Sequence, residues 1–138
     1  MIDYARLLEE YELWPMESWN HFDFVHQPPS DPAEEARQVD VLRSKVSSGV
    51  SGVYAYAKDG KWIYVGKGAP LFNRLKSHYL ISYKELPGDT KDKRWHRFFS
   101  SNVGHLAIYW KQVEREPDRR IFELALTELL EPAFERFR

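Results

Sequence analysis

Cysteine is absent from this chain of 138 residues, and so are long apolar runs and a signal-like start. Without cysteine the chain can form neither disulfides nor thiolate zinc sites, which is compatible with a reducing compartment. No stretch approaches the roughly 18 apolar residues of a membrane span. The first residues lack the basic start and apolar middle of a signal peptide. We therefore expect a cytoplasmic protein that does not contact the membrane and has the core of a single domain.

Positive charge is scarce at the start of the chain and concentrated in its middle. Residues 1–57 carry 4 Lys/Arg against 10 Asp/Glu, whereas residues 58–97 carry 10 Lys/Arg against 4 Asp/Glu. A basic segment of this kind is typical of proteins that bind polyanions such as nucleic acid. It is equally typical of a solvated charged surface, so charge alone leaves both interpretations open.

Two helices are expected in the acidic first part. Apolar residues recur at helical spacing over residues 3–13. Asp31 and Pro32, a cap followed by proline at the first helical position, predict a second helix that runs to about Val46. Between them, the aromatic and proline-rich residues 14–32 are expected to form an ordered loop. We expect these helices to be a structural cover, with partner binding as the alternative.

The segment GVYAYAKDGKWIYVGK predicts a hairpin, because residues 52–57 and 61–66 alternate strongly. A two-residue Asp59-Gly60 turn would place Tyr54 opposite Val65, and a three-residue loop over 58–60 would place it opposite Tyr64. A one-residue slip exchanges the two faces of the hairpin, so the side-chain pattern decides between the registers. We prefer the three-residue loop, because the two-residue turn would mix the apolar residues with the tyrosines. Its two faces are then Val53, Ala55, Ala57, Ile63 and Val65, and Tyr54, Tyr56, Trp62, Tyr64 and Gly66.

Three more elements follow. They are a helix over 70–80, a third strand over 104–113, and a last helix from Arg119 to about Leu130. In the last helix we expect Ile121 to face the core and Glu123 to lie on the more polar side. The fold class is α+β, a small three-stranded antiparallel sheet flanked by helices. Residues 1–48 would form an N-terminal helical extension packed on a domain of residues 49–138.

The tripeptides GVY at 52–54 and YVG at 64–66 are separated by nine residues. They resemble the two signature tripeptides of the GIY-YIG nucleases. The residues that follow are similar to the excision-repair endonucleases of that family. Arg74 lies ten positions after Tyr64, where those relatives carry an essential arginine. His78, four positions later, stands where relatives carry His or Tyr.

Further matches lie on either side of this segment. Lys67 follows YVG as it does in the excision-repair members, and Glu123 resembles the metal-binding glutamate of the family's last helix. Pro132 follows Glu123 by nine positions. Glu135 departs from the pattern, because relatives often carry there an asparagine that helps hold the site together. The resemblance covers about residues 50–135, and the ordered set is much more specific than the two tripeptides alone.

The resemblance implies a GIY-YIG fold and a metal-dependent endonuclease that hydrolyses DNA at a single site. A base must take a proton from the attacking water, and a phenol needs stabilisation of its ionised form to do so. Tyr54 would be that base, assisted by Tyr64, Lys67 and the metal. The assignment of Tyr64 as the base stays open. His78 would orient the water or the phosphate.

The remaining roles concern charge. Arg74 would hold a nonbridging phosphate oxygen through its planar donors. Glu123 would be a protein ligand of one Mg²⁺ or Mn²⁺ that keeps most of its waters. The metal would stabilise charge on the leaving oxygen. A dimer or another protein could be needed to select the site that is cut.

The basic-aromatic run KDKRWHRFF contributes a second candidate surface. Lys91, Lys93, Arg94 and Arg97 could contact a nucleic-acid backbone, and the interleaved aromatic residues could stack on bases. Equally, the aromatic residues could be core and the charges a solvated rim. Two rival functions are a nucleic-acid-binding module of the same fold that has lost turnover, and an interaction protein built on the acidic helices.

Overall fold

The structure of the protein, a computed structural model, describes residues 1–84 and 90–134, and of residues 90–92 the backbone alone. Within these residues one antiparallel sheet has the strand order β1-β4-β2-β3. The strands are β1 (Asn20–His26), β2 (Gly52–Lys58), β3 (Lys61–Gly68) and β4 (Gly104–Gln112). The helices are α1 (Tyr4–Glu10), η1 (Met16–Ser18, a 3-10 turn), α2 (Pro32–Lys45), α3 (Leu71–Ile81), α4 (Thr90–Ser100) and α5 (Glu116–Leu130).

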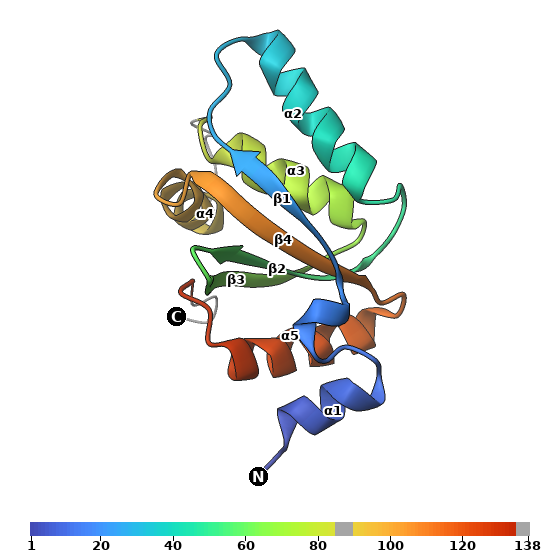
Figure 1. Ribbon diagram of the computed structural model, residues 1–138. Helices are drawn as coiled ribbons and strands as arrows, with labels where there is room; N and C mark the ends of the chain where they lie inside the picture. The colour runs from blue at the N-terminus through green and yellow to red at the C-terminus, as the bar shows by residue number, and fades with distance from the viewer. Residues whose placement is uncertain (85–89, 135–138) are drawn as a thin grey trace.

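The helices lie in two layers, one on each face of the sheet (Figure 1). Helices α2, α3 and α4 cover one face, where their apolar residues form one core with Tyr54, Tyr56 and Tyr64. Helices α1 and α5 cover the other face, which carries Val53, Ala55 and Val65. Among the described helices, not one has both the length and the apolar character that a membrane crossing requires.

The α+β prediction is confirmed, but the predicted number of three strands is wrong. The additional strand is β1, in the segment that we expected to be a loop, and it pairs along its whole length with β4. Its residues alternate, with Phe22, Phe24 and His26 buried and the residues between them exposed. This alternation is hard to recognise in the sequence, because prolines flank the strand and histidine occurs on both its exposed and its buried side. The N-terminal segment therefore completes the sheet rather than only covering it.

The predicted turn of the β2–β3 hairpin is also wrong. Lys58 pairs with Lys61, so Asp59 and Gly60 form a two-residue turn, with φ of 51° and 76°. Positive φ at both central residues is what a tight hairpin turn with the correct twist requires. The sequence Asp-Gly is well suited to it, because glycine adopts such angles without steric cost.

A β-bulge then restores the predicted grouping of the tyrosines. Beyond Ala57 and Trp62 the register shifts by one residue, so that Tyr56 pairs with Tyr64. In the same register Tyr54 lies opposite Gly66, not opposite Tyr64 as predicted. Because the bulge adds one residue to β3, the β3 side chains beyond it face the opposite sides of the sheet from those that the two-residue turn alone would give. The three tyrosines consequently share one face, whereas Ile63 and Trp62 exchange faces.

The predicted helix starts follow from local hydrogen bonds. The Asp31 carboxylate accepts a hydrogen bond from the Glu34 backbone N–H at 2.7 Å, which caps α2 as expected. Helix α4 was not predicted, although Trp95 and Phe99 recur at helical spacing on its buried side. In α5 the expectation for Ile121 is wrong, since it is 51% exposed. Phe122, Ala125 and Leu126 face the sheet, and Ile121 lies off this stripe.

Candidate active site

Three tyrosines form the centre of the candidate site. Tyr54 and Tyr56 come from β2 and Tyr64 from β3, and each is no more than 1% exposed. The ring centroid of Tyr54 lies 5.9 Å from those of both other tyrosines. Gly66 lies opposite Tyr54, and a Cβ atom there would stand 2.5 Å from the Tyr54 hydroxyl oxygen. The glycine of YVG is therefore needed to make room for the Tyr54 side chain.

Helix α3 adds a histidine and an arginine to this cluster. The Tyr54 hydroxyl lies 2.5 Å from His78 Nε2, a hydrogen bond buried in the protein. The His78 ring also packs edge-on against Tyr64, with 5.0 Å between centroids. Arg74 is one turn earlier on α3, and the centre of its guanidinium lies 5.1 Å from the Trp95 ring centroid. As their spacing predicts, Arg74 and His78 lie on one side of the helix.

Burial controls the ionisation of Tyr54. It raises the pKa of Tyr54 well above the usual value of a phenol, and the neighbouring Tyr64 and Tyr56 raise it further. The positive charge of Arg74 opposes this effect on the Tyr54 pKa. Tyr54 is consequently protonated at neutral pH, so it can serve as a base only if its own proton has an acceptor. His78 Nε2 lies where such an acceptor is required.

Helix α4 covers the cluster with aromatic side chains. Phe99 stacks on His78 at 4.5 Å between centroids, and Trp95 packs edge-on against the same ring at 5.1 Å. His78 and Phe99 are both 0% exposed. Trp95 and Phe99 of the basic-aromatic run are thus core, as one of the two sequence interpretations expected, and they cover the His78 side of the tyrosine site.

Two more of the expected site residues, Lys67 and Glu123, are related to helix α5. Lys67 Nζ is 3.9 Å from Glu116 Oε1 on α5, so the Lys67 side chain lies on the α5 side of the sheet. Glu123 is also on α5 and is 5% exposed rather than on a polar surface.

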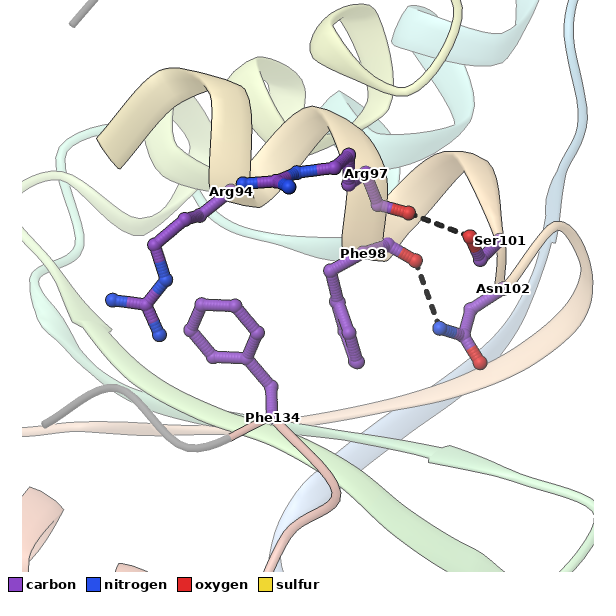
Figure 2. Close-up of a pocket in the computed structure, with 6 residues that line it drawn as sticks. All are labelled: Arg94, Arg97, Phe98, Ser101, Asn102 and Phe134. Carbon is purple, nitrogen blue, oxygen red and sulfur yellow. Dashed lines mark hydrogen bonds between the residues drawn. The ribbon is translucent and has the colours of Figure 1, made fainter. Parts of the chain in front are cut away.

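Of the expected nucleic-acid-binding residues, Lys93, Arg94 and Arg97 have described side chains, and all three are on α4. Lys93 and Arg97 are exposed, whereas Arg94 is half-buried with its guanidinium 5.1 Å from the Phe134 ring centroid. Arg94 and Arg97 border an open groove of about 350 Å³, shown in Figure 2, that is lined by Arg94, Arg97, Phe98, Ser101, Asn102 and Phe134. The Lys91 side chain and Glu135 lie outside the described residues.

Sequence reasoning did not assign a role to two residues that the fold brings to this region. Tyr56 is the third phenol of the cluster, and its position two residues after Tyr54 on one strand was the available signal. Phe134 packs on Tyr64 at 5.0 Å between centroids although 70 positions separate them in the sequence. It arrives there because its backbone N–H donates a hydrogen bond to the Ile63 carbonyl at 2.9 Å. No local pattern signals such a contact.

Comparison with known proteins gives a sequence relative. Over 85 residues the chain is 33% identical to UvrABC system protein C of Aliarcobacter butzleri (strain RM4018). The match covers 61% of this chain and 13% of that protein, so the chain corresponds to about an eighth of the relative's length. No family model matches the chain.

Solved structures of one domain are also similar. The magnesium-bound GIY-YIG N-terminal endonuclease domain of UvrC from Thermotoga maritima is 26% identical, with a TM-score of 0.47 over 70% of this chain and 97% of that chain. A tyrosine-to-phenylalanine variant of that domain, bound to its catalytic divalent cation, is 26% identical, with a TM-score of 0.47 over 70% and 96%. At these TM-scores the backbone of this chain superposes only in part on that domain.

The class of protein follows from the site rather than from the overlap. Two motif tyrosines on neighbouring strands meet a histidine of the next helix, and the charge of Arg74 from the same helix acts on Tyr54. Together with the UvrC sequence match, the ordered motif supports a GIY-YIG nuclease domain.

Proposed function

We propose that this protein is an endonuclease that hydrolyses DNA phosphodiester bonds at the tyrosine site with the help of one divalent cation. The proposal rests mainly on the 2.5 Å hydrogen bond between the Tyr54 hydroxyl and His78 Nε2 beside Arg74. UvrC, the relative in sequence, has a GIY-YIG endonuclease domain, which supports the same chemistry and a DNA substrate.

The proton path uses Tyr54 and His78 in sequence. With the imidazole neutral and protonated at Nδ1, Nε2 accepts the hydrogen bond of the Tyr54 hydroxyl. The phenol oxygen then takes a proton from the attacking water as its own proton passes to Nε2. His78 is in this scheme the final acceptor, and the high pKa of Tyr54 is no obstacle because free phenolate never accumulates.

Arg74 binds the phosphate in this scheme. Its guanidinium is planar and permanently charged, so it can hold a nonbridging oxygen through two donors. It now rests on the Trp95 ring, and His78 beneath is 0% exposed. Because Tyr54 is 1% exposed, a phosphate bound by Arg74 would reach the Tyr54 hydroxyl only after the covering aromatic side chains had shifted. Binding of DNA along α4 would supply the energy for that shift.

Glu123 is the residue that would hold the cation. The described residues contain no group of three or more side chains suited to metal binding, and a single carboxylate fits Mg²⁺, which keeps several waters. A bound cation would neutralise charge on the phosphate and the leaving oxygen.

A plasmid-nicking assay with Mg²⁺ or Mn²⁺ tests the function. We expect the wild-type chain to convert supercoiled DNA to the open circle, and Arg74→Ala and Glu123→Ala to abolish conversion. Arg37→Ala is the matched control, because Arg37 is an exposed arginine on α2, away from the site. No cutting by the folded wild-type chain with either metal would overturn the proposal.

The closed site favours one alternative, a nucleic-acid-binding module of this fold without turnover. Tyr54, Tyr64 and His78 are together almost fully buried beneath α4. Salt-dependent DNA binding without cleavage under any divalent metal would identify this alternative. Cleavage that is lost with Arg74→Ala would exclude it.

A further inference from the structure

The groove beside α4 is distinct from the buried tyrosine site. Its walls are the last turns of α4, with Arg94, Arg97 and Phe98, and the C-terminal segment that carries Phe134. In Figure 2 the Phe98 and Phe134 side chains project into the same space below α4, with Asn102 at one end and Arg94 at the other. The groove is open and has a volume of about 350 Å³. This is near the lower limit of ligand sites, so it suits a ligand of about one nucleotide.

Aromatic contacts join this groove to the proposed catalytic site. Phe98 and Phe134 lie 4.9 Å apart between ring centroids. Both also pack on Tyr64, at 5.9 Å and 5.0 Å. A group seated in the groove is therefore one aromatic layer away from Tyr64. A nucleotide bound there would be a near neighbour, along the nucleic-acid strand, of the phosphate on which Tyr54 and Arg74 act.

The polar groups of the groove are suited to a nucleotide. Arg97 is exposed on α4, and the Arg94 guanidinium lies over the Phe134 ring. The Asn102 side chain donates a hydrogen bond to the Phe98 carbonyl at 2.8 Å, which holds the amide at the groove wall. An amide has a second N–H donor and a carbonyl acceptor, the pair that base edges require. The Ser101 hydroxyl donates to the Arg97 carbonyl at 2.7 Å.

We propose that this groove binds one unpaired nucleotide of the substrate, an inference that rests on the proposed nuclease function. The base would lie against Phe98 and Phe134, and Arg97 would contact the adjoining phosphate. A paired base has both faces stacked within the duplex and cannot offer one to a protein ring. Cationic side chains around aromatic rings are the usual composition of sites for single-stranded nucleic acid. The substrate would accordingly contain a bulged, gapped or extruded nucleotide next to the cut.

The proposal predicts a preference for unpaired DNA that depends on the rings. We would compare a duplex with the same duplex bearing one bulged 2-aminopurine, in EDTA so that binding is separated from cutting. Stacking should quench 2-aminopurine fluorescence, and the bulged DNA should bind about 5- to 150-fold more tightly. Phe98→Leu and Phe134→Leu should each remove much of that preference, because they keep apolar volume but lose the ring.

Arg97→Ala separates the phosphate contact from the base contact. It should weaken binding of both DNAs by a similar factor and lower the salt dependence by about one ion. Arg37→Ala on α2 is the matched control and should change neither. Far-ultraviolet circular dichroism of each variant would confirm folding, and Arg97→Ala keeps the experiment informative if a ring variant does not fold.

Equal affinity of the wild-type chain for both DNAs, without quenching, would overturn the groove assignment. Unchanged preference in folded Phe98→Leu and Phe134→Leu would overturn it as well. A lost preference together with intact plasmid nicking would leave the nuclease proposal standing. A ring-dependent preference without nicking would support the groove while contradicting the nuclease.

Discussion

The two faces of the β2–β3 hairpin bury the same strands in opposite ways. Val53, Ala55 and Val65 face α5 in an aliphatic core. Tyr54, Tyr56 and Tyr64 face α3 and α4, where polar ring atoms meet one another. An aliphatic core requires only complementary volume, whereas each buried polar group also requires a partner. Arranging such partners costs free energy. We therefore interpret the tyrosine face as the one that serves the proposed reaction.

The largest expected contrast between the two faces is a loss of activity on one and a loss of stability on the other. We expect Tyr54→Phe to reduce cleavage about 10²- to 10⁴-fold, the usual contribution of a positioned acid or base. Val65→Ala on the opposite face should instead lower the free energy of unfolding by about 1–3 kcal/mol and leave cleavage by the folded protein nearly unchanged. Nicking rates and urea unfolding curves of both variants would measure this; similar activity losses in the two would contradict the comparison.

His26 shows what happens on the tyrosine face when a buried polar group lacks a partner. It is 0% exposed among Phe24, Tyr79 and Phe99, and no hydrogen-bond partner exists for either ring nitrogen within the described residues. Burial lowers the pKa of His26 from 6.5 to about 4. The unfolded chain therefore binds a proton between these pH values that the folded chain does not, and acidification favours unfolding.

As the pH falls from 6.5 to 4, protonation of His26 in the unfolded chain should lower the free energy of unfolding by up to about 3 kcal/mol. Below pH 4 this loss should level off, because His26 is then protonated in both states. His26→Phe removes the titrating group and keeps an aromatic ring, so its stability should fall less steeply over this range. Urea unfolding at several pH values would measure the difference between the two proteins. Parallel pH profiles would show that His26 does not contribute.

Gly66 tests how closely the tyrosine face is packed. A methyl group there would stand 2.5 Å from the Tyr54 ring and hydroxyl, so the ring must move. We expect Gly66→Ala to destabilise the fold by about 1–3 kcal/mol and to reduce cleavage beyond that effect. Gly60→Ala, at a position where a Cβ meets no atom within 4 Å, is the control for strain at φ of 76° without crowding. Retained cleavage in folded Gly66→Ala would show that Tyr54 tolerates displacement.

The smallest effect is expected on the α5 side. Lys67 and Glu116 are 3.9 Å apart and both partly solvated, so Glu116→Gln should change stability by about 0–1 kcal/mol. If Lys67 acts only through this pair, Lys67→Met should leave cleavage within about twofold, which is below half a kcal/mol. A large loss of cleavage in Lys67→Met with unchanged stability would instead place Lys67 in the reaction.

The sequence predicted local structure well where the signals were local. Asp31 and Pro32 marked the start of α2, and the spacing of Arg74 and His78 put both on one side of α3. The strand β1 was missed because its pairing partner β4 lies some 80 residues away. The bulge at Ile63 was missed because it is a tertiary compromise between a two-residue turn and the burial of the tyrosines.

By itself the sequence determined the alternation of β2 and β3, the ordered motif residues and their family, because these depend on neighbours along the chain. Tertiary structure alone decided that Tyr54 reaches His78, that α4 encloses both, and that Phe134 joins Phe98 at a groove. It also decided that Lys67 lies near Glu116 on the α5 side of the sheet. Such contacts depend on how side chains distant in sequence share a limited volume, and no local period encodes that.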